Sequence, residues 1–152
     1  GKNLVMFMLD TSHAVHHKDQ VPWLEQEFIK HAGKKYKFAL YHVPLYPSVR
    51  LETGEYETRG RTHWLPLFDK YGLTTAFENH DHALKRTKLL KDNKEDPTGT
   101  LYLGDGCFGQ EPRELDNHTR AYMAYALSYV SEERGWFAWC CSVWCVLLSV
   151  LV

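Results

Sequence analysis

Short apolar segments alternate with segments of helical periodicity along the first half of this sequence, and this alternation constrains the fold more than any other feature. The apolar segments are of strand length and cover residues 4–9, 36–43 and 73–77. The first is apolar without interruption, which is typical of a strand that is covered on both faces. Strands that alternate with helices form parallel crossover units. We therefore predict an α/β fold, with a layered sheet and crossover helices.

The segments between these strands have the features of crossover helices. Residues 20–32 carry apolar side chains at helical spacing, and Gly33 follows as a stop. Thr62 is a suitable N-cap for a second helix, which we expect to end at Gly72. The stretch 52–61 before it is rich in Glu and Arg, and such charge runs are typical of a solvated loop. We predict two helices, with the strand 36–43 and this polar loop between them.

The second half of the chain predicts further strands and one more helix. Residues 84–90 and 100–104 are predicted strands, and the stretch between them is rich in the turn-forming residues Asn, Asp, Pro and Gly. Over 114–131, apolar and aromatic residues recur at near-helical spacing, which predicts a helix.

The last segment, 136–152, contains no charged residue. A helix there would be about 25 Å long at about 1.5 Å per residue, close to the hydrocarbon thickness of about 30 Å. We predict a membrane contact through this tail, with a buried strand pair as the alternative. The chain is thus divided into a globular domain over 1–110, a helix or linker over 111–135, and the apolar tail.

The charge balance excludes nucleic acid as a partner. The 18 Lys and Arg are matched by 19 Asp and Glu, which gives a formal net charge of -1. Such a chain has no basic excess that a phosphate backbone could attract. We expect no binding of DNA or RNA.

Histidine is frequent in this sequence, with nine residues, and several of them are clustered. His42 ends the second predicted strand, and His80 and His82 follow the third. In an extended segment, residues two apart project to the same side. Because the carboxyl ends of parallel strands border the crevice in which ligands bind, the three imidazoles are predicted to meet around a common cation.

The other histidines have simpler explanations. His13, His16 and His17 lie in a polar loop, and we expect their side chains to be solvated. His63 is expected to begin the second helix, and a contact with a substrate phosphate is the alternative.

Short motifs occur in a consistent order between residues 4 and 109. They are Leu9-Asp10-Thr11, Gln20-x-x-Trp23-Leu24, His42-x-Pro44-x-Tyr46, Trp64-x-Pro66-Leu67-Phe68-x-Lys70-Tyr71-Gly72, His80-x-His82 with Arg86-Thr87, and Gly99-Thr100-x-Tyr102. In this order the chain resembles the C-terminal half of the purple acid phosphatases, which are calcineurin-like metallophosphoesterases. The resemblance implies that residues 1–110 are the C-terminal part of a calcineurin-like phosphoesterase sandwich.

The resemblance also implies a function and a set of metal ligands. The function is hydrolysis of phosphate esters, with two divalent or trivalent metal ions (Fe, Zn or Mn) as cofactors. His42 and His80 match ligands of one metal, and His82 matches a ligand of the other. Arg86 matches the arginine that follows the His-x-His motif and is expected to be structural. Asn79 stands where the family motif has glycine.

The family's remaining ligands, which lie on Asp, Gly-Asp and Gly-Asn-His motifs, have no match upstream of Leu4. Asp10 is an acidic residue nearby, but it occupies the loop after a later strand of the family pattern. Neutral imidazoles alone do not offset the charge of two metals, and carboxylates normally share that task. We expect at most one weakly held metal and little or no hydrolysis by this chain alone.

Two alternatives to a phosphoesterase remain open. The chain begins with Gly1 directly before an apolar run, which indicates a piece of something longer. One alternative is a non-catalytic truncated remnant that lacks the upstream metal ligands and is tethered to a membrane of the secretory pathway by 136–152. The other is a structural zinc site in which Cys107 joins the three histidines as a fourth ligand.

Overall fold

The computed structural model describes residues 2–107, 110–116 and 120–128. The elements, in chain order, are β1 (Leu4–Met8), α1 (His17–Lys30), β2 (Tyr36–Tyr41), α2 (Glu55–His63), α3 (Leu65–Tyr71), β3 (Thr75–Glu78), β4 (Ala83–Lys91), β5 (Lys94–Glu95), β6 (Thr100–Gly106) and β7 (Met123–Leu127).

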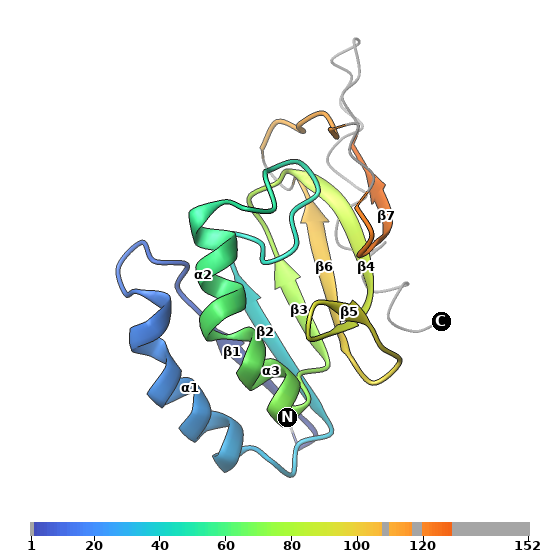
Figure 1. The fold of residues 1–152 in the computed structure, drawn as a ribbon. Helices are drawn as coiled ribbons and strands as arrows, with labels where there is room; N and C mark the ends of the chain where they lie inside the picture. The colour runs from blue at the N-terminus through green and yellow to red at the C-terminus, as the bar shows by residue number, and fades with distance from the viewer. Residues whose placement is uncertain (1, 108–109, 117–119, 129–152) are drawn as a thin grey trace.

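The described strands form one seven-stranded sheet in the order β1-β2-β3-β6-β4-β5, with β7 paired to β4 (Figure 1). β1, β2, β3 and β6 are parallel neighbours. β4 is antiparallel to β6 on one side and to β7 on the other. The crossovers from β1 to β2 and from β2 to β3 run through helices, so the predicted α/β fold with a layered sheet and crossover helices is confirmed.

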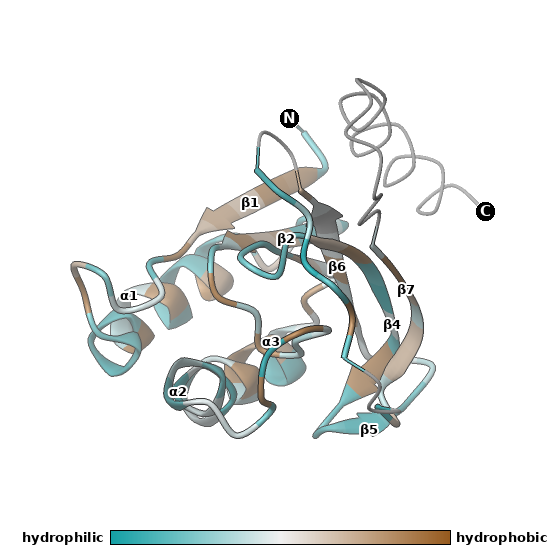
Figure 2. Cartoon of the chain, turned by 90° about the horizontal axis from the view of Figure 1, so that it is seen from above, coloured by the Kyte–Doolittle hydropathy of each residue, from teal (hydrophilic) through white to brown (hydrophobic). Residues whose placement is uncertain are grey.

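The three helices lie together on one face of the sheet, as the view from above shows (Figure 2). Between the helices and the sheet lies a core that contains Phe28, Trp64, Phe68 and Tyr102, all fully buried. Burial of aromatic side chains of this size is the main stabilising contribution to such a core.

β1 departs from the prediction for residues 4–9. Phe7 of this strand is buried against the helices, but the alternating residues Leu4, Met6 and Met8 are 40%, 43% and 65% exposed. Since successive side chains of a strand point to opposite faces, only one face of β1 is covered by the described residues. The predicted coverage of both faces is therefore wrong for this part of the chain.

α2 occupies most of the stretch that we expected to be a polar loop. Its buried positions are Glu57 and Gly60, and an ion pair one turn apart joins Glu55 to Arg59. A helix without an apolar stripe gives no periodic signal. Thr62 lies in this helix and donates a hydrogen bond to Thr58 O, so it does not cap the next one.

α3 begins with Trp64 at its N-cap and ends at Gly72, which adopts a left-handed conformation with φ 65°. The predicted stop at Gly72 is confirmed, because a left-handed residue after the last turn strongly favours glycine. The turn from β4 to β5 uses Asp92 and Asn93, both with positive φ, as expected for a two-residue hairpin loop.

The helix predicted over 114–131 is wrong where the structure describes it. Residues 123–127 form β7, which pairs with Leu84–Thr87 of β4. Without β7 this edge of β4 would leave backbone groups unpaired, and the pairing satisfies them. No helix among the described residues is long and apolar enough to cross a membrane. The segment 136–152 lies outside the described residues.

Candidate functional site

Two of the predicted ligands, His42 and His80, meet at the carboxyl ends of adjacent parallel strands. β2 ends at Tyr41 and β3 ends at Glu78, and these residues are partners in the sheet register. His42 and His80 follow in the next turns, and His42 Nε2 lies 2.8 Å from His80 Nδ1. Their rings stand edge to face with centroids 4.6 Å apart. The strand-end rule thus brings these two imidazoles together.

Asn79 holds the turn that carries His80. Its backbone N–H donates to His42 O at 3.1 Å, and its side-chain Nδ2 donates to Tyr41 O at 2.8 Å. His80 and His82 both have positive φ, 69° and 54°, a conformation that is uncommon outside glycine. Asn79, at the position where the resemblance leads us to expect glycine, therefore ties the turn to β2.

His82 lies further along the same turn, with Nδ1 2.8 Å from Glu111 O. A carbonyl oxygen only accepts, so in the neutral form of the ring Nδ1 carries the hydrogen and Nε2 has the lone pair. Metal-ligating histidines typically have this arrangement, in which the second ring nitrogen donates to a carbonyl or carboxylate. Arg113 donates its backbone N–H to His82 O at 3.3 Å and its side chain to His80 O.

Both paired imidazoles are neutral near pH 7. Burial, followed by the charge of Arg50 and the neighbouring His42, lowers the pKa of His80 to about 4. Burial, followed by His13 and His82, also lowers the pKa of His42 below its ordinary value. The neutral ring is the form that binds a metal.

A buried ionic network lies beneath this turn. Lys85 Nζ is 2.8 Å from Glu78 Oε2, and both side chains are completely buried. Lys85 Nζ donates a hydrogen bond to Tyr46 O at 2.5 Å. Glu78 Oε2 has no hydrogen-bond partner among the described residues, so its contact with Lys85 is an ion pair. Glu78 Oε1 accepts from Leu45 N at 2.7 Å and from Tyr41 Oη at 2.8 Å.

Asp81 extends the network to the loop that follows His42. Its Oδ2 accepts from Ser48 N at 2.5 Å and from Ser48 Oγ at 3.0 Å. The segments after β2 and β3 are therefore fixed to each other by buried charges. Neither Asp81 nor Lys85 could be expected from the sequence, because their burial depends on contacts with the distant segment around Tyr46 and Ser48. Arg86, which we expected to be structural, lies on the exposed face of β4.

The loop after β1 closes around Asp10. Its carboxylate accepts from the backbone N–H groups of His13, Ala14 and Val15 at 2.8, 2.7 and 2.8 Å. Burial raises the pKa of Asp10, but these three donors outweigh it and the pKa lies below its ordinary value. The loop places the exposed ring of His13 5.7 Å from that of His42.

Two histidines lie elsewhere than expected. His17 is the first residue of α1 and is only 1% exposed, with its ring 4.4 Å from that of Trp64. The prediction of a solvated side chain is therefore wrong for His17, because a tryptophan far along the sequence covers it. His63 ends α2 rather than beginning a helix.

Among the described residues, His42 and His80 lie close enough to share one metal. Two nitrogens on one tetrahedral zinc, each about 2.0–2.1 Å from it, lie about 3.3 Å apart, so the His42–His80 pair would need to open slightly. No group of three or more His, Cys, Asp or Glu side chains in the described part of the chain could hold a metal ion. Cys107 is one of the described residues and belongs to no such group, so the structural zinc site with four ligands gains no support.

Comparison with known proteins gives relatives of one kind. The chain is 31% identical over 94 residues to purple acid phosphatase 18 of Arabidopsis thaliana, which is 59% of this chain and 21% of that protein. It is 26% identical over 134 residues to purple acid phosphatase 22 of the same plant, covering 80% of this chain and 31% of the relative. No family model matches the chain. The chain thus spans about a fifth to a third of the length of these relatives.

Solved structures share the fold. Purple acid phosphatase PPD1 from yellow lupin (Lupinus luteus) seeds superposes with a TM-score of 0.69 at 18% identity, over 81% of this chain and 24% of the other. GAP50, the anchor in the inner membrane complex of Plasmodium, superposes with a TM-score of 0.64 at 13% identity, over 82% and 38%.

Proposed function

This chain is a relative of the purple acid phosphatases, and we propose that it contributes to the metal-dependent hydrolysis of phosphate esters as part of a complete domain. The observation that carries the proposal is the 2.8 Å approach of His42 Nε2 and His80 Nδ1 at two adjacent strand ends. These are the positions that match the family's ligands. A phosphate ester is the substrate class that follows from this relationship.

In this proposal His42 and His80 bind one metal and His82 binds a second. The metals are Fe, Zn or Mn in divalent or trivalent form. Two such ions, when bound, polarise a phosphoryl oxygen and supply a nucleophile at mild pH. The contact of His82 Nδ1 with Glu111 O and the lowered pKa values of His42 and His80 support these roles.

The surrounding residues hold the ligands rather than react. Asn79 fixes the turn to β2, Glu111 O fixes the protonated nitrogen of His82, and the Glu78–Lys85 pair anchors both loops. Ligands held in place by neighbouring hydrogen bonds lose less conformational entropy when a metal binds.

The experiment measures hydrolysis of a chromogenic phosphate monoester by the complete protein. His80→Ala and His82→Ala are expected to abolish metal-dependent turnover. His31→Ala, at the C-cap of α1 beside Glu27, is the matched control that leaves it unchanged. Full activity in both site variants would reject the proposed ligands. The 152-residue chain by itself is expected to show little or no turnover.

A non-catalytic remnant is the second candidate. It is favoured by the carboxylates of the described residues near the site, since Asp10, Glu78 and Asp81 are all engaged in other contacts. Calorimetric titration of the chain with Zn²⁺ is the measurement, and at most one weakly bound ion is expected. Two tightly bound ions would exclude this candidate. Tethering through 136–152, outside the described residues, stays part of this proposal.

A further inference from the structure

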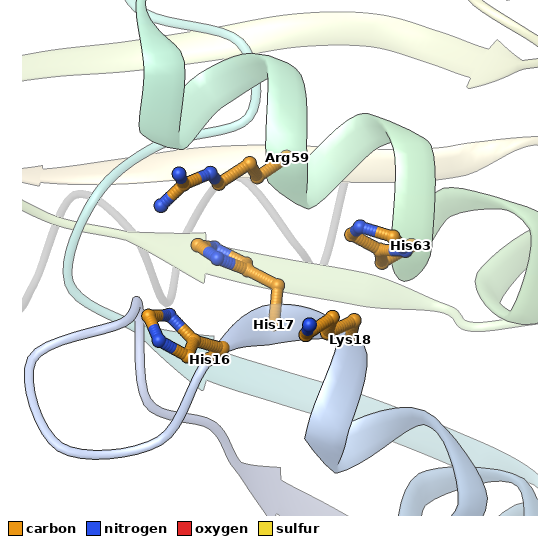
Figure 3. Close-up of a pocket in the computed structure, with 5 residues that line it drawn as sticks. All are labelled: His16, His17, Lys18, Arg59 and His63. Carbon is orange, nitrogen blue, oxygen red and sulfur yellow. The ribbon is translucent and has the colours of Figure 1, made fainter.

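A second cluster of basic side chains lies outside the candidate metal site. It lines a cavity of about 220 Å³ between the start of α1 and α2 (Figure 3). The lining residues are His16, His17, Lys18, Arg59 and His63. Drug-sized ligands occupy cavities of about 300–1,000 Å³, so this one suits a small ion.

His17 supplies the observation that points to a ligand. The residue is 1% exposed and lines the cavity, and its Nε2 has no hydrogen-bond partner among the described residues. Ser12 Oγ accepts from His17 N at 3.3 Å and lies 2.6 Å from His17 Nδ1. We assign the tautomer in which the Ser12 hydroxyl donates to Nδ1, so that Nε2 carries the hydrogen. A buried N–H donor without an acceptor needs explaining in a native structure.

The start of α1 faces the same cavity. His16 is the N-cap, and its side chain makes no capping hydrogen bond. His17 N donates to Ser12 Oγ and Asp19 N donates to His16 O, so these two backbone groups already have partners. The helix dipole still favours negative charge at this end of α1. Lys18 adds a cation in the same turn. Asp19, the acidic residue of that turn, is not among the residues that line the cavity.

α2 forms the other side of the cavity, through Arg59 and His63. Arg59 and His63 are one turn apart on this helix, so their side chains share a face. Arg59 is paired with Glu55 at the exposed edge of α2, and its guanidinium has donors for a second acceptor. His63 is the first neighbouring group, followed by Arg59, that adds to burial in lowering the pKa of His17 to about 4.

We propose that this cavity binds a tetrahedral oxyanion of the phosphate class. The His17 Nε2–H donates to the anion from below, Lys18 and Arg59 provide charge-assisted hydrogen bonds, and the start of α1 faces it. The anion is either free inorganic phosphate or the second phosphate group of an ester. The proposal does not depend on the metal site, because none of the five residues is a proposed metal ligand.

The test follows the histidine ring signals of the 152-residue chain by ¹H–¹⁵N NMR during titration with inorganic phosphate. The His17 and His63 signals are expected to shift with saturation, whereas chloride at equal ionic strength leaves them in place. Lys18→Gln and Arg59→Gln, two substitutions at the surface, are each expected to weaken binding about tenfold, the factor for one charge-assisted hydrogen bond.

Lys30→Gln at the other end of α1 removes the same charge and is expected to leave the affinity unchanged. A titration with a small bisphosphate ester identifies the source of the anion: equal affinity indicates a free ion, and at least tenfold tighter binding indicates a second phosphate of an ester. The proposal is overturned if phosphate gives no saturable shift, if chloride shifts the same signals equally, or if Lys30→Gln weakens binding as much as Lys18→Gln and Arg59→Gln.

Discussion

Lys85 Nζ and Glu78 Oε2 lie 2.8 Å apart with both side chains completely buried, directly beneath the turn that carries the candidate ligands. Glu78 is the last residue of β3 and Lys85 the third residue of β4, so the pair spans the turn. Removal of one partner from a buried pair leaves the other charge without compensation, which is strongly destabilising. The pair therefore fixes where the turn stands relative to the sheet.

Lys85→Met is expected to lower the free energy of unfolding by about 3–5 kcal/mol, because Glu78 is left buried and unpaired. Urea denaturation measures the change. Lys88→Met on the same strand is the control, since the Lys88–Glu95 pair is exposed and worth about 0–1 kcal/mol. The double variant Lys85→Met with Glu78→Gln is expected to recover part of the loss. A loss below about 1 kcal/mol for Lys85→Met would show that the pair is not needed.

Gly99 is expected to tolerate no side chain. A Cβ at this position would lie 2.4 Å from the carbonyl carbon of Leu90 and 2.5 Å from its oxygen, and this backbone is fixed in the β4–β6 pairing. Gly99→Ala should therefore destabilise the chain by about 2 kcal/mol or more. Gly33→Ala is the control, because no atom lies within 4 Å of its added Cβ. Equal midpoints of thermal unfolding for the two variants would contradict this account.

The parallel part of the fold could be predicted because its signals are local. Residues 4–9 are apolar throughout, and Gly72 marks a helix end by its own conformational freedom. α2 could not be predicted, since its buried positions are Glu57 and Gly60 and no apolar stripe identifies them. The sequence predicts a helix in place of β7, because the pairing with β4 that decides the conformation of this segment is not local.

The candidate site, too, could be predicted from the sequence only in part. The nearness of His42 and His80 follows from a general rule about strand ends, and it could be expected from sequence alone. The burial of His17 depends on Trp64, which donates its indole N–H to His17 O at 3.1 Å across a large sequence separation. Contacts between distant segments leave no pattern of spacing, so neither this burial nor the basic cavity beside it could be foreseen.

His17 is expected to make the stability of the fold depend on pH. Burial, then the charges of His63 and Arg59, lowers its pKa to about 4, against about 6.5 in the unfolded chain. The folded state thus binds fewer protons in this window, so stability is fully present above pH 6.5 and is lost as the pH falls toward 4. At about 1.4 kcal/mol per pKa unit, the loss amounts to up to about 3 kcal/mol.

Urea denaturation of the chain and of His17→Gln at pH 7.5 and pH 5, in buffers without phosphate, measures this effect. The difference in stability between the two pH values is expected to be smaller in His17→Gln. The remaining difference comes partly from His80, whose pKa is lowered to about 4 as well. An unchanged pH dependence in His17→Gln would show that His17 does not titrate in this way.

Asp10 is expected to act as the closing residue of the loop after β1 and not as a metal ligand. Its two carboxylate oxygens already accept three backbone N–H groups, those of residues 13–15. Asp10→Ala should lower the free energy of unfolding by about 2 kcal/mol, since these donors lose a charged acceptor. Asp19→Ala, an exposed carboxylate in the first turn of α1, is the control and should change it by less than about 1 kcal/mol. Calorimetric titration with Zn²⁺ separates the two roles, because a closing residue can be removed without changing the His42–His80 pair. Loss of zinc binding in a folded Asp10→Ala chain would make Asp10 a ligand after all.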